Sequence, residues 1–231
     1  MPSLWISGLT KTFGTLKAVD DFSLEIASGT VHSLVGENGA GKSTVVKCVY
    51  GLYSPTAGKF KIDNKILTIK TPRDAMKYGI GMVHQHFMLV PSLSVYKNVV
   101  LGDEPTRGLI FNHHGAIEAV RHLSAQYGLN IDPLAPVHSL PVGIQQRVEI
   151  LKLLYRKAEI LIFDEPTAVL SPREIEGLFS IIREFRKAGK TIIFIAHNLN
   201  EVLAVSDVIT VMRKGKHIAT LPRSEATSEE L

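Results

Sequence analysis

The fold of this chain is decided by the stretch Gly36-Glu37-Asn38-Gly39-Ala40-Gly41-Lys42-Ser43-Thr44. It follows residues 31–35, predicted to be a strand, and leads into an apolar run at 44–50, predicted to be a helix. Glycines let the backbone curl so that consecutive N–H groups point inward and bind an anion, and the helix N-terminus adds about half a positive charge. The pattern GxxxxGK(S/T) in this context predicts a phosphate-binding loop.

Two side chains of this loop carry the chemistry that a nucleoside triphosphate needs. The ammonium of Lys42 is predicted to reach the β- and γ-phosphates, and the hydroxyl of Ser43 is predicted to ligate Mg²⁺. We therefore expect ATP and Mg²⁺ as cofactors, with the whole loop around the phosphates. The alternative is a glycine-rich turn that matches the pattern by chance, and the strand–loop–helix context disfavours it.

A second polar cluster follows the apolar run at residues 160–163, where Asp164 and Glu165 are adjacent. Open α/β sheets bind ligands at the carboxyl ends of their strands. Asp164 is predicted to hold Mg²⁺, directly or through water, and Glu165 to polarise the attacking water as the general base. A lone acidic pair usually marks a solvated turn, but the pairing with a phosphate loop favours catalysis.

The order of predicted elements indicates the fold class. Early strands predict an antiparallel β layer, residues 92–156 are predicted to be a helical insertion, and strands then alternate with helices as in a parallel α/β sheet. The predicted strands are residues 4–10, 22–26, 31–35, 59–63, 81–83, 160–163 and 191–195, with a hairpin of 207–212 and 217–221. Besides the helix at 44–50, a short helix is predicted to begin after residue 71. Further helices are predicted over residues 94–101, 114–127, 172–188 and 198–205.

Composition narrows the function classes. The 231 residues allow one large domain with a sizeable core, and the apolar runs are strand-sized, whereas a membrane span needs roughly 20 residues. The first residues lack the layout of a signal peptide, so a membrane task would require a separate partner. The net charge of +4 comes from scattered Lys and Arg, and we expect no nucleic-acid partner. The single Cys48 fits a reducing cytoplasm.

Four further features make the chain resemble the ATP-binding-cassette (ABC) family over essentially its whole length. Residues 140–147 are similar to the family's LSGGQ signature and its QR continuation. Gln85 follows a predicted strand, as the Q-loop glutamine does, and His197 follows another, like the switch histidine. Phe13 matches the aromatic residue that stacks on adenine, and Val19 is expected to add an apolar contact.

The resemblance implies an α/β fold with a P-loop NTPase core of ABC type, an antiparallel β layer and an inserted helical subdomain. Residues 1–231 would form one ABC ATPase domain, with 1–91 and 157–231 as the core and 92–156 as the insertion. It also implies catalytic roles for Glu165, His197 and Gln85, and magnesium contacts from Ser43, Gln85 and Asp164.

The resemblance further implies how two cassettes bind head to tail, with ATP between the phosphate loop of one and the signature of the other. The second cassette would be a tandem half or another copy of this chain. The signature residues expected to face the partner's ATP are Leu140, Pro141, Val142, Gly143, Ile144 and Gln145. The helical insertion would contact cytoplasmic loops of transmembrane permease subunits, with Gln85 at the hinge.

Within the family, residues 82–91 and 164–170 resemble importers of nucleosides and simple sugars. Those motors usually carry two cassettes in one chain of about twice this length. We therefore expect the N-terminal cassette of a tandem protein that continues beyond residue 231. It would lie on the cytoplasmic face of a bacterial inner membrane, in an assembly with a periplasmic or lipoprotein substrate-binding protein.

Two departures from the family pattern keep alternatives open. Pro141 stands at the signature serine and Val142 at its first glycine, while residues 169–171 lack a common aspartate. Pro141 offers neither a hydroxyl nor an N–H, so the facing ATP site is predicted to be impaired. The alternative is that Pro141 merely starts the signature helix and that donors at Gly143 suffice.

The competing functions are a soluble ABC ATPase acting on ribosomes or DNA and a regulatory cassette with impaired hydrolysis. The DNA-repair relatives insert long coiled coils, and the ribosomal ones join two cassettes by a charged linker; neither feature is visible in this sequence. The presence of Glu165, Gln85 and His197 argues against the regulatory alternative.

Overall fold

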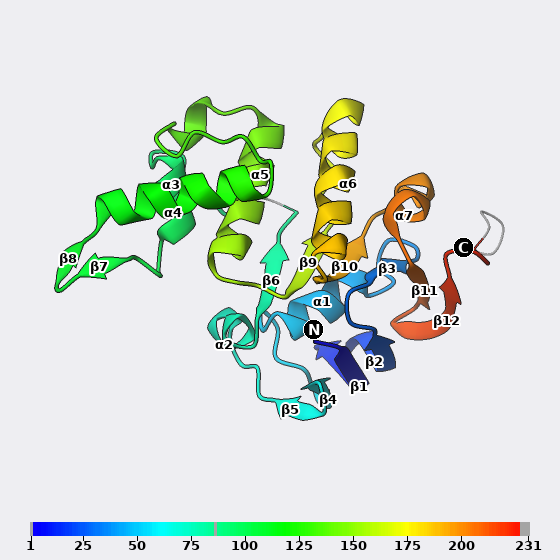
Figure 1. Ribbon diagram of the computed structural model, residues 1–231. Helices are drawn as coiled ribbons and strands as arrows, with labels where there is room; N and C mark the ends of the chain where they lie inside the picture. Colours follow the sequence, from blue (N-terminus) through cyan, green and yellow to red (C-terminus); the bar gives the residue numbers. More distant parts are fainter. Residues whose placement is uncertain (1, 86, 227–231) are drawn as a thin grey trace.

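The computed structural model describes residues 2–85 and 87–226 of the chain, which form two large sheets and a group of helices (Figure 1). The predicted continuation beyond residue 231 and the side chain of His86 lie outside the described residues. The fold class is the predicted one, a mixed α/β structure with a parallel sheet and an antiparallel sheet.

The six-stranded sheet carries the functional loops at one of its edges. Its order is β12-β11-β3-β10-β9-β6, with all neighbours parallel except the pair of β11 and β12. The strands are β3 (Val31–Val35), β6 (Ile80–Val83), β9 (Ile160–Asp164), β10 (Thr191–Ile195), β11 (Val208–Arg213) and β12 (Lys216–Pro222). Every residue of β3, β6, β9 and β10 is buried, which explains why their sequences are mostly apolar.

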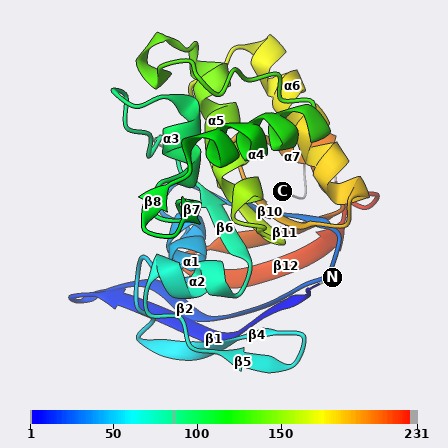
Figure 2. The same ribbon diagram turned by 60° about the vertical axis from the view of Figure 1, so that its left-hand side comes forward.

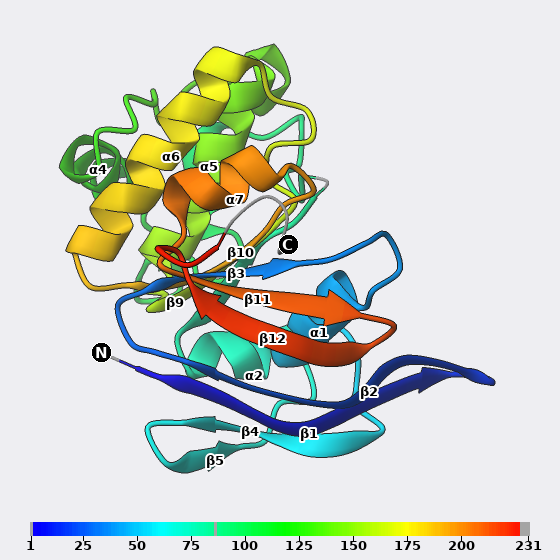
Figure 3. The same ribbon diagram turned by 90° about the vertical axis from the view of Figure 1, so that its right-hand side faces the viewer.

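The antiparallel layer has four strands in the order β2-β1-β4-β5. These are β1 (Leu4–Phe13), β2 (Leu16–Ile26), β4 (Ala57–Ile62) and β5 (Lys65–Leu67). Figure 3 shows helix α1 (Lys42–Val49) between this layer and the parallel sheet, where a cluster of buried side chains from all three joins them. The phosphate loop therefore enters a helix that is packed on both sides.

Of the remaining helices, α2 (Pro72–Lys77) lies on the same side of the parallel sheet as α1, and the others cover the opposite face or lie beside it (Figure 2). These others are α3 (Val95–Val100), α4 (His113–Gln126), the short 3₁₀ helix η1 (Val137–Ser139), α5 (Val142–Tyr155), α6 (Pro172–Lys187) and α7 (Leu199–Val205). Helices α2 and α6 begin with capping boxes, Thr71 with Asp74 and Ser171 with Glu174. Helices α3, α4 and α5 pack against one another.

The prediction that residues 92–156 are helical was wrong at one place. A two-stranded hairpin of β7 (Thr106–Arg107) and β8 (Ile110–Phe111) lies between α3 and α4. The turn contains Gly108 at φ +63°, a conformation that ends a helix and suits a tight hairpin. Strand β5 was not predicted either, because three residues are too few for a period-2 pattern.

Within residues 2–85 and 87–226, the structure contains no helix with the length and apolar character that crossing a bilayer requires.

Candidate active site

The phosphate loop joins β3 to α1, and two of its glycines hold backbone that other residues could not. Gly36 has φ +144°, and a Cβ there would lie 2.1 Å from the carbonyl oxygen of Met212. Gly41 has φ +100°, and a Cβ there would lie 2.5 Å from the carbonyl oxygen of Ala18. Because the obstacle in each case is backbone, the curl of the loop requires glycine at both positions.

Lys42 is the first residue of α1, and its ammonium lies inside the curl. The residue is 4% exposed, and Nζ donates hydrogen bonds to the carbonyl oxygens of Gly36 at 2.7 Å and Glu37 at 3.0 Å. Burial lowers the pKa of Lys42, and the nearby carboxylates of Glu165 and Asp164 oppose that shift. The loop thus holds a positive charge where a phosphate would need one.

Ser43 and Asp164 bring two oxygen atoms together beside the loop. The Ser43 hydroxyl donates to Oδ1 of Asp164 at 2.8 Å, and Asp164 is 2% exposed at the end of β9. Burial raises the pKa of Asp164, while the hydrogen bond from Ser43 lowers it. Hydroxyl and carboxylate oxygens are ligands that Mg²⁺ prefers, and Mg²⁺ commonly takes one or two protein ligands together with phosphates and water. The residues present therefore fit this ion.

Glu165 lies between the two polar residues that the family resemblance singles out. The Nε2 atom of Gln85 donates to Oε2 of Glu165 at 3.1 Å, and Nε2 of His197 lies 2.6 Å from Oε1. Glu165 has φ +52°, and its N–H donates to the carbonyl oxygen of Ile195 at 3.0 Å. The ends of β6, β9 and β10 thus bring the three expected catalytic side chains into one hydrogen-bonded group. In this group the Gln85 amide nitrogen contacts Glu165 and not the Ser43–Asp164 pair.

A cleft above the phosphate loop connects these groups. Its lining comprises Phe13, Leu16, Ala18, Asn38, Gly39, Ala40, Gly41, Lys42, Ser43, Thr44, Glu165 and His197. Phe13 is 43% exposed, and its ring packs edge-to-face with the ring of Tyr53, with the two ring centroids 5.2 Å apart. The Lys11 ammonium lies 4.9 Å from the Phe13 ring centroid. An aromatic ring at the rim and phosphate donors at the floor match the two ends of a nucleotide.

Val19, which was expected to add an apolar contact, does not line the cleft. Val19 is fully buried, with its side chain beside Gly41, whereas Leu16 and Ala18 of the same strand line the cleft. Side chains alternate between the two faces of a strand, so Val19 and Ala18 cannot both face the ligand. Sequence analysis missed Leu16 and Ala18, although the period-2 pattern of β2 was available as a signal.

The residues 140–145, which we call the signature segment, lie at the start of α5. Pro141 is the N-cap residue, with φ −55° and ψ 153°, and the N–H groups of Ile144 and Gln145 donate to its carbonyl oxygen. Pro141 and Val142 are exposed, whereas Gly143 is buried. Among the residues that the structure describes, those of the signature segment do not line the cleft.

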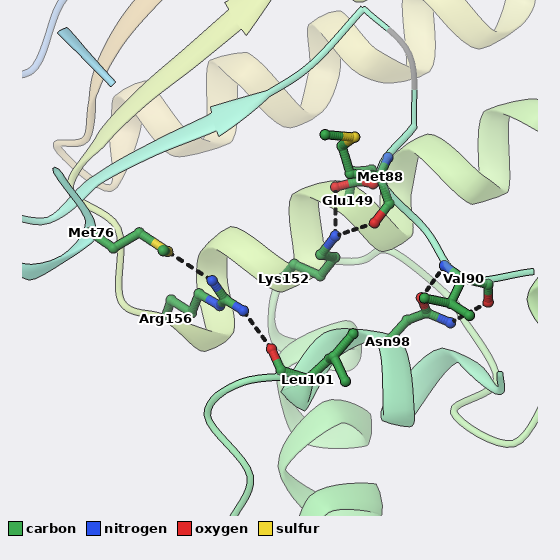
Figure 4. Close-up of polar contacts among 8 residues, drawn as sticks. All are labelled: Met76, Met88, Val90, Asn98, Leu101, Glu149, Lys152 and Arg156. Atoms are coloured by element: carbon green, nitrogen blue, oxygen red, sulfur yellow. Dashed lines mark hydrogen bonds and ion pairs between the residues drawn. The ribbon is translucent and has the colours of Figure 1, made fainter. Parts of the chain in front are cut away.

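The segment that follows Gln85 is fixed to the helices by side chains (Figure 4). The N–H of Met88 donates to Oε1 of Glu149 at 2.6 Å, and the Lys152 ammonium donates to the carbonyl oxygen of Met88 at 3.0 Å. Two residues later, Asn98 accepts from the N–H of Val90 at 2.7 Å and donates to its carbonyl oxygen at 3.1 Å. Helix α5 therefore binds the N–H and the carbonyl group of Met88, and helix α3 binds the N–H and the carbonyl group of Val90.

Glu149 and Lys152 belong to α5, the helix that begins in the signature segment, so their contacts bind Met88 to that helix. Arg156, just after α5, extends the connection by donating to the carbonyl oxygen of Leu101 at 2.6 Å. Its other Nη atom lies 2.7 Å from Sδ of Met76 on α2 (Figure 4). Sequence analysis missed all of these residues, because Glu149 and Lys152 in an apolar helix give no signal that they bind a loop.

Fold and site together define a nucleotide-binding protein of the P-loop class, and comparison with known proteins makes the class more specific. Residues 19–168 match the family model described as "ABC transporter". The chain is 48% identical over 223 residues to the nucleoside import ATP-binding protein NupA of Lactococcus lactis, which covers 96% of the chain and 44% of that protein. It is 46% identical to the guanosine import ATP-binding protein NupO of Bacillus subtilis, and this match also covers 96% of the chain and 44% of the relative.

Solved structures agree with this result. An ATP-binding cassette, MJ1267, in its ADP conformation superposes with a TM-score of 0.84 at 26% identity, covering 96% of this chain and 91% of that one. CbiO1 of Clostridium perfringens superposes with a TM-score of 0.84 at 28% identity, and the match covers 98% of this chain and 91% of CbiO1. The chain belongs to the ABC transporter family and is an ATP-binding cassette, the ATPase domain of that family. It spans less than half the length of the two import proteins.

Proposed function

We propose that this chain is the ATP-hydrolysing motor of an importer for nucleosides or simple sugars. One observation carries the hydrolytic part of the proposal: Glu165 is held between Gln85 and His197 at the mouth of a complete phosphate loop. The names of the relatives, which include nucleoside, guanosine and ribose import ATP-binding proteins, support the transport part.

The cleft provides separate contacts for the parts of ATP. Phe13 would stack on the adenine base, with Leu16 and Ala18 beside it. The loop amides and the Lys42 ammonium would hold the β- and γ-phosphates, with Lys42 exchanging its carbonyl acceptors for phosphate oxygens. Ser43 and Asp164 would hold Mg²⁺, which neutralises charge on the phosphates when bound.

Hydrolysis would use the group around Glu165. A water placed beside this carboxylate attacks the γ-phosphorus and gives its proton to Glu165, while the bond from the γ-phosphorus to the β–γ bridging oxygen breaks to leave ADP and inorganic phosphate. Gln85 and His197 would orient that water and contact the γ-phosphate. Their hydrogen bonds to Glu165 already fix all three side chains in one arrangement.

A second cassette is part of the proposal because the signature segment lies outside the lining of the chain's own cleft. Its residues would face ATP bound to a tandem half or to another copy of this chain. Residues 92–156 would form the helical subdomain that contacts the permease subunits, and residues 1–91 and 157–231 the core. The assembly would include a substrate-binding protein, and the cassette would lie on the cytoplasmic face of the membrane.

The test is reconstitution of the full-length protein with its membrane subunits in lipid vesicles. We expect ATP-dependent uptake of a nucleoside or a simple sugar, and no uptake when the cassette carries Glu165→Gln. ATP hydrolysis without association with any membrane subunit would overturn the transport part. The absence of ATP binding by the folded chain would overturn the whole proposal.

A further inference from the structure

A carboxylate of this chain lies on the backbone amide that the signature segment would offer to a phosphate. The N–H of Gly143 donates to Oε1 of Glu174 at 3.1 Å. The approach is close, since a Cβ built on Gly143 would lie 2.3 Å from the same oxygen. Gly143 is buried, so this donor is covered and does not face solvent.

Glu174 is held in this place by its own helix. Its other oxygen, Oε2, accepts hydrogen bonds from the N–H of Ser171 at 2.9 Å and from the Ser171 hydroxyl at 2.7 Å, which form the capping box of α6. One carboxylate therefore caps α6 and contacts the first turn of α5. Helix α6 follows strand β9, which ends at Asp164, and helix α5 carries the signature segment.

We infer that Glu174 competes with the γ-phosphate of the partner cassette's ATP for the signature segment, so that the segment binds ATP only after the carboxylate has moved. The inference rests on the proposed function, in which the signature segment faces a nucleotide on a second cassette. A carboxylate and a phosphate cannot share one N–H donor, and two negative charges in contact repel each other.

The surroundings give the displaced carboxylate a place to go. Arg147 lines the same small cavity as Gly143 and Glu174, together with apolar side chains of α5 and α6. Its guanidinium is a charged donor that can pair with the carboxylate in place of the Gly143 amide.

The hydrogen bond from Gly143 to Glu174 also bears on whether Gly143 can make up for the donors that Pro141 lacks. Proline offers no hydroxyl and no N–H, which leaves Gly143 as a main donor of the signature segment. Because that donor is already bound within the chain, the Gly143 amide does not compensate for the serine missing at position 141. The two features act in the same direction and weaken the same facing site.

The test uses the 231-residue chain in a Glu165→Gln background, in which bound ATP persists. Sedimentation velocity measures the ATP-dependent association of two copies, and titration of a dilute sample with a fluorescent ATP analogue measures binding to the chain's own phosphate loop. Glu174→Gln removes the charge and keeps the capping box, which accepts Gln as well as Glu. Glu176→Gln, an equal charge change at an exposed position on the same helix, is the matched control.

We expect Glu174→Gln to strengthen ATP-dependent association about tenfold, since a donor released to a charged acceptor is worth a factor of that order. Glu176→Gln should change it little, and both should bind the analogue as the parent chain does. Glu174→Ala should act in the same direction as Glu174→Gln, whereas a purely structural role predicts weaker association. Unchanged or weaker association in both Glu174 variants, with analogue binding intact, overturns the inference; failure of analogue binding in the parent chain overturns the proposed function instead.

Discussion

The Nε2 atom of His197 lies 2.6 Å from Oε1 of Glu165, and the other carboxylate oxygen accepts a hydrogen bond from Gln85. Both oxygens of the expected general base are therefore engaged by residues from neighbouring strand ends. Each carboxylate oxygen has more than one lone pair, so Glu165 can still accept a hydrogen bond from the attacking water while these contacts persist. His197 has 47% of its side chain exposed, and we expect it to turn toward the γ-phosphate in the ATP-bound state.

Glu165→Gln should leave ATP binding intact and lower the rate of hydrolysis by about 10²–10⁴-fold, because an amide cannot accept the proton of the attacking water. Phosphate release from the reconstituted assembly measures the rate, and equilibrium titration measures binding. Glu184→Gln, an exposed carboxylate on α6 paired with Lys187, is the control and should hydrolyse at the parent rate. Parent-like turnover in Glu165→Gln would show that another group is the base.

Lys42→Ala should abolish most of the affinity for ATP and leave the fold intact. The ammonium makes its contacts with carbonyl oxygens of the loop, so its loss removes the charge that the phosphates would meet. Calorimetric titration with ATP measures the affinity, and circular dichroism reports the fold. A folded Lys42→Ala protein that binds ATP as tightly as the parent would contradict the assignment of the phosphate loop.

Phe13→Ala should weaken binding of ATP by about 5–150-fold, since loss of base stacking on an aromatic ring costs about 1–3 kcal/mol. Binding of inorganic triphosphate should stay unchanged, because Phe13 lies at the rim and the phosphates would lie at the floor of the cleft. Phe13→Trp is the matched control and should retain ATP affinity. Equal losses for ATP and triphosphate would refute stacking as the role of Phe13.

Buried apolar runs and glycine-rich loops made the core of this fold predictable. Strands β3 and β10 have the predicted bounds, because each is a fully buried run that ends at a loop with its own signal. The capping boxes fixed the starts of α2 and α6 for a similar reason, since they depend on residues three apart in the sequence.

Contacts between distant segments could not be predicted in this way. Glu149 and Lys152 bind the backbone of Met88, which lies 61 and 64 residues earlier in the chain, and no local sequence pattern requires these contacts. The position of Glu174 three residues after Ser171 indicates a capping role, but its second contact with Gly143 depends on how α5 and α6 pack. The exclusion of Val19 from the cleft follows from strand alternation, which the sequence contained and the motif-based expectation ignored.

The stability of the chain should fall in mild acid because of His32. This residue is 1% exposed, and burial, with a smaller contribution from nearby His217, lowers its pKa from 6.5 to about 4. Between these values the unfolded chain binds a proton that the folded chain does not. The free energy of unfolding should therefore drop by about 3 kcal/mol as the pH falls through that window, with no further loss from this group below it.

Urea unfolding at a series of pH values measures this effect. His32→Gln keeps a hydrogen-bonding group near the position of Nε2, which contacts the Thr210 hydroxyl at 2.7 Å, and does not titrate. The slope of stability against pH should be shallower in this variant than in the parent chain across the same window. Identical slopes would show that His32 is protonated in the folded chain or that its site opens before unfolding.

The last prediction concerns Pro141, which the structure places at the N-cap of α5 with no side-chain capping bond. Serine is a favoured N-cap residue, so Pro141→Ser should add a capping hydroxyl and an N–H without disturbing the helix. Both groups can reach a phosphate on the partner cassette, and one such donor is worth about 2.7–4 kcal/mol in a transition state. In the full assembly with the other ATP pocket disabled, turnover should rise in Pro141→Ser. Pro141→Ala restores the N–H alone and should give a smaller rise. If neither variant gains turnover, Pro141 serves only to start the helix, and the two pockets do not differ on its account.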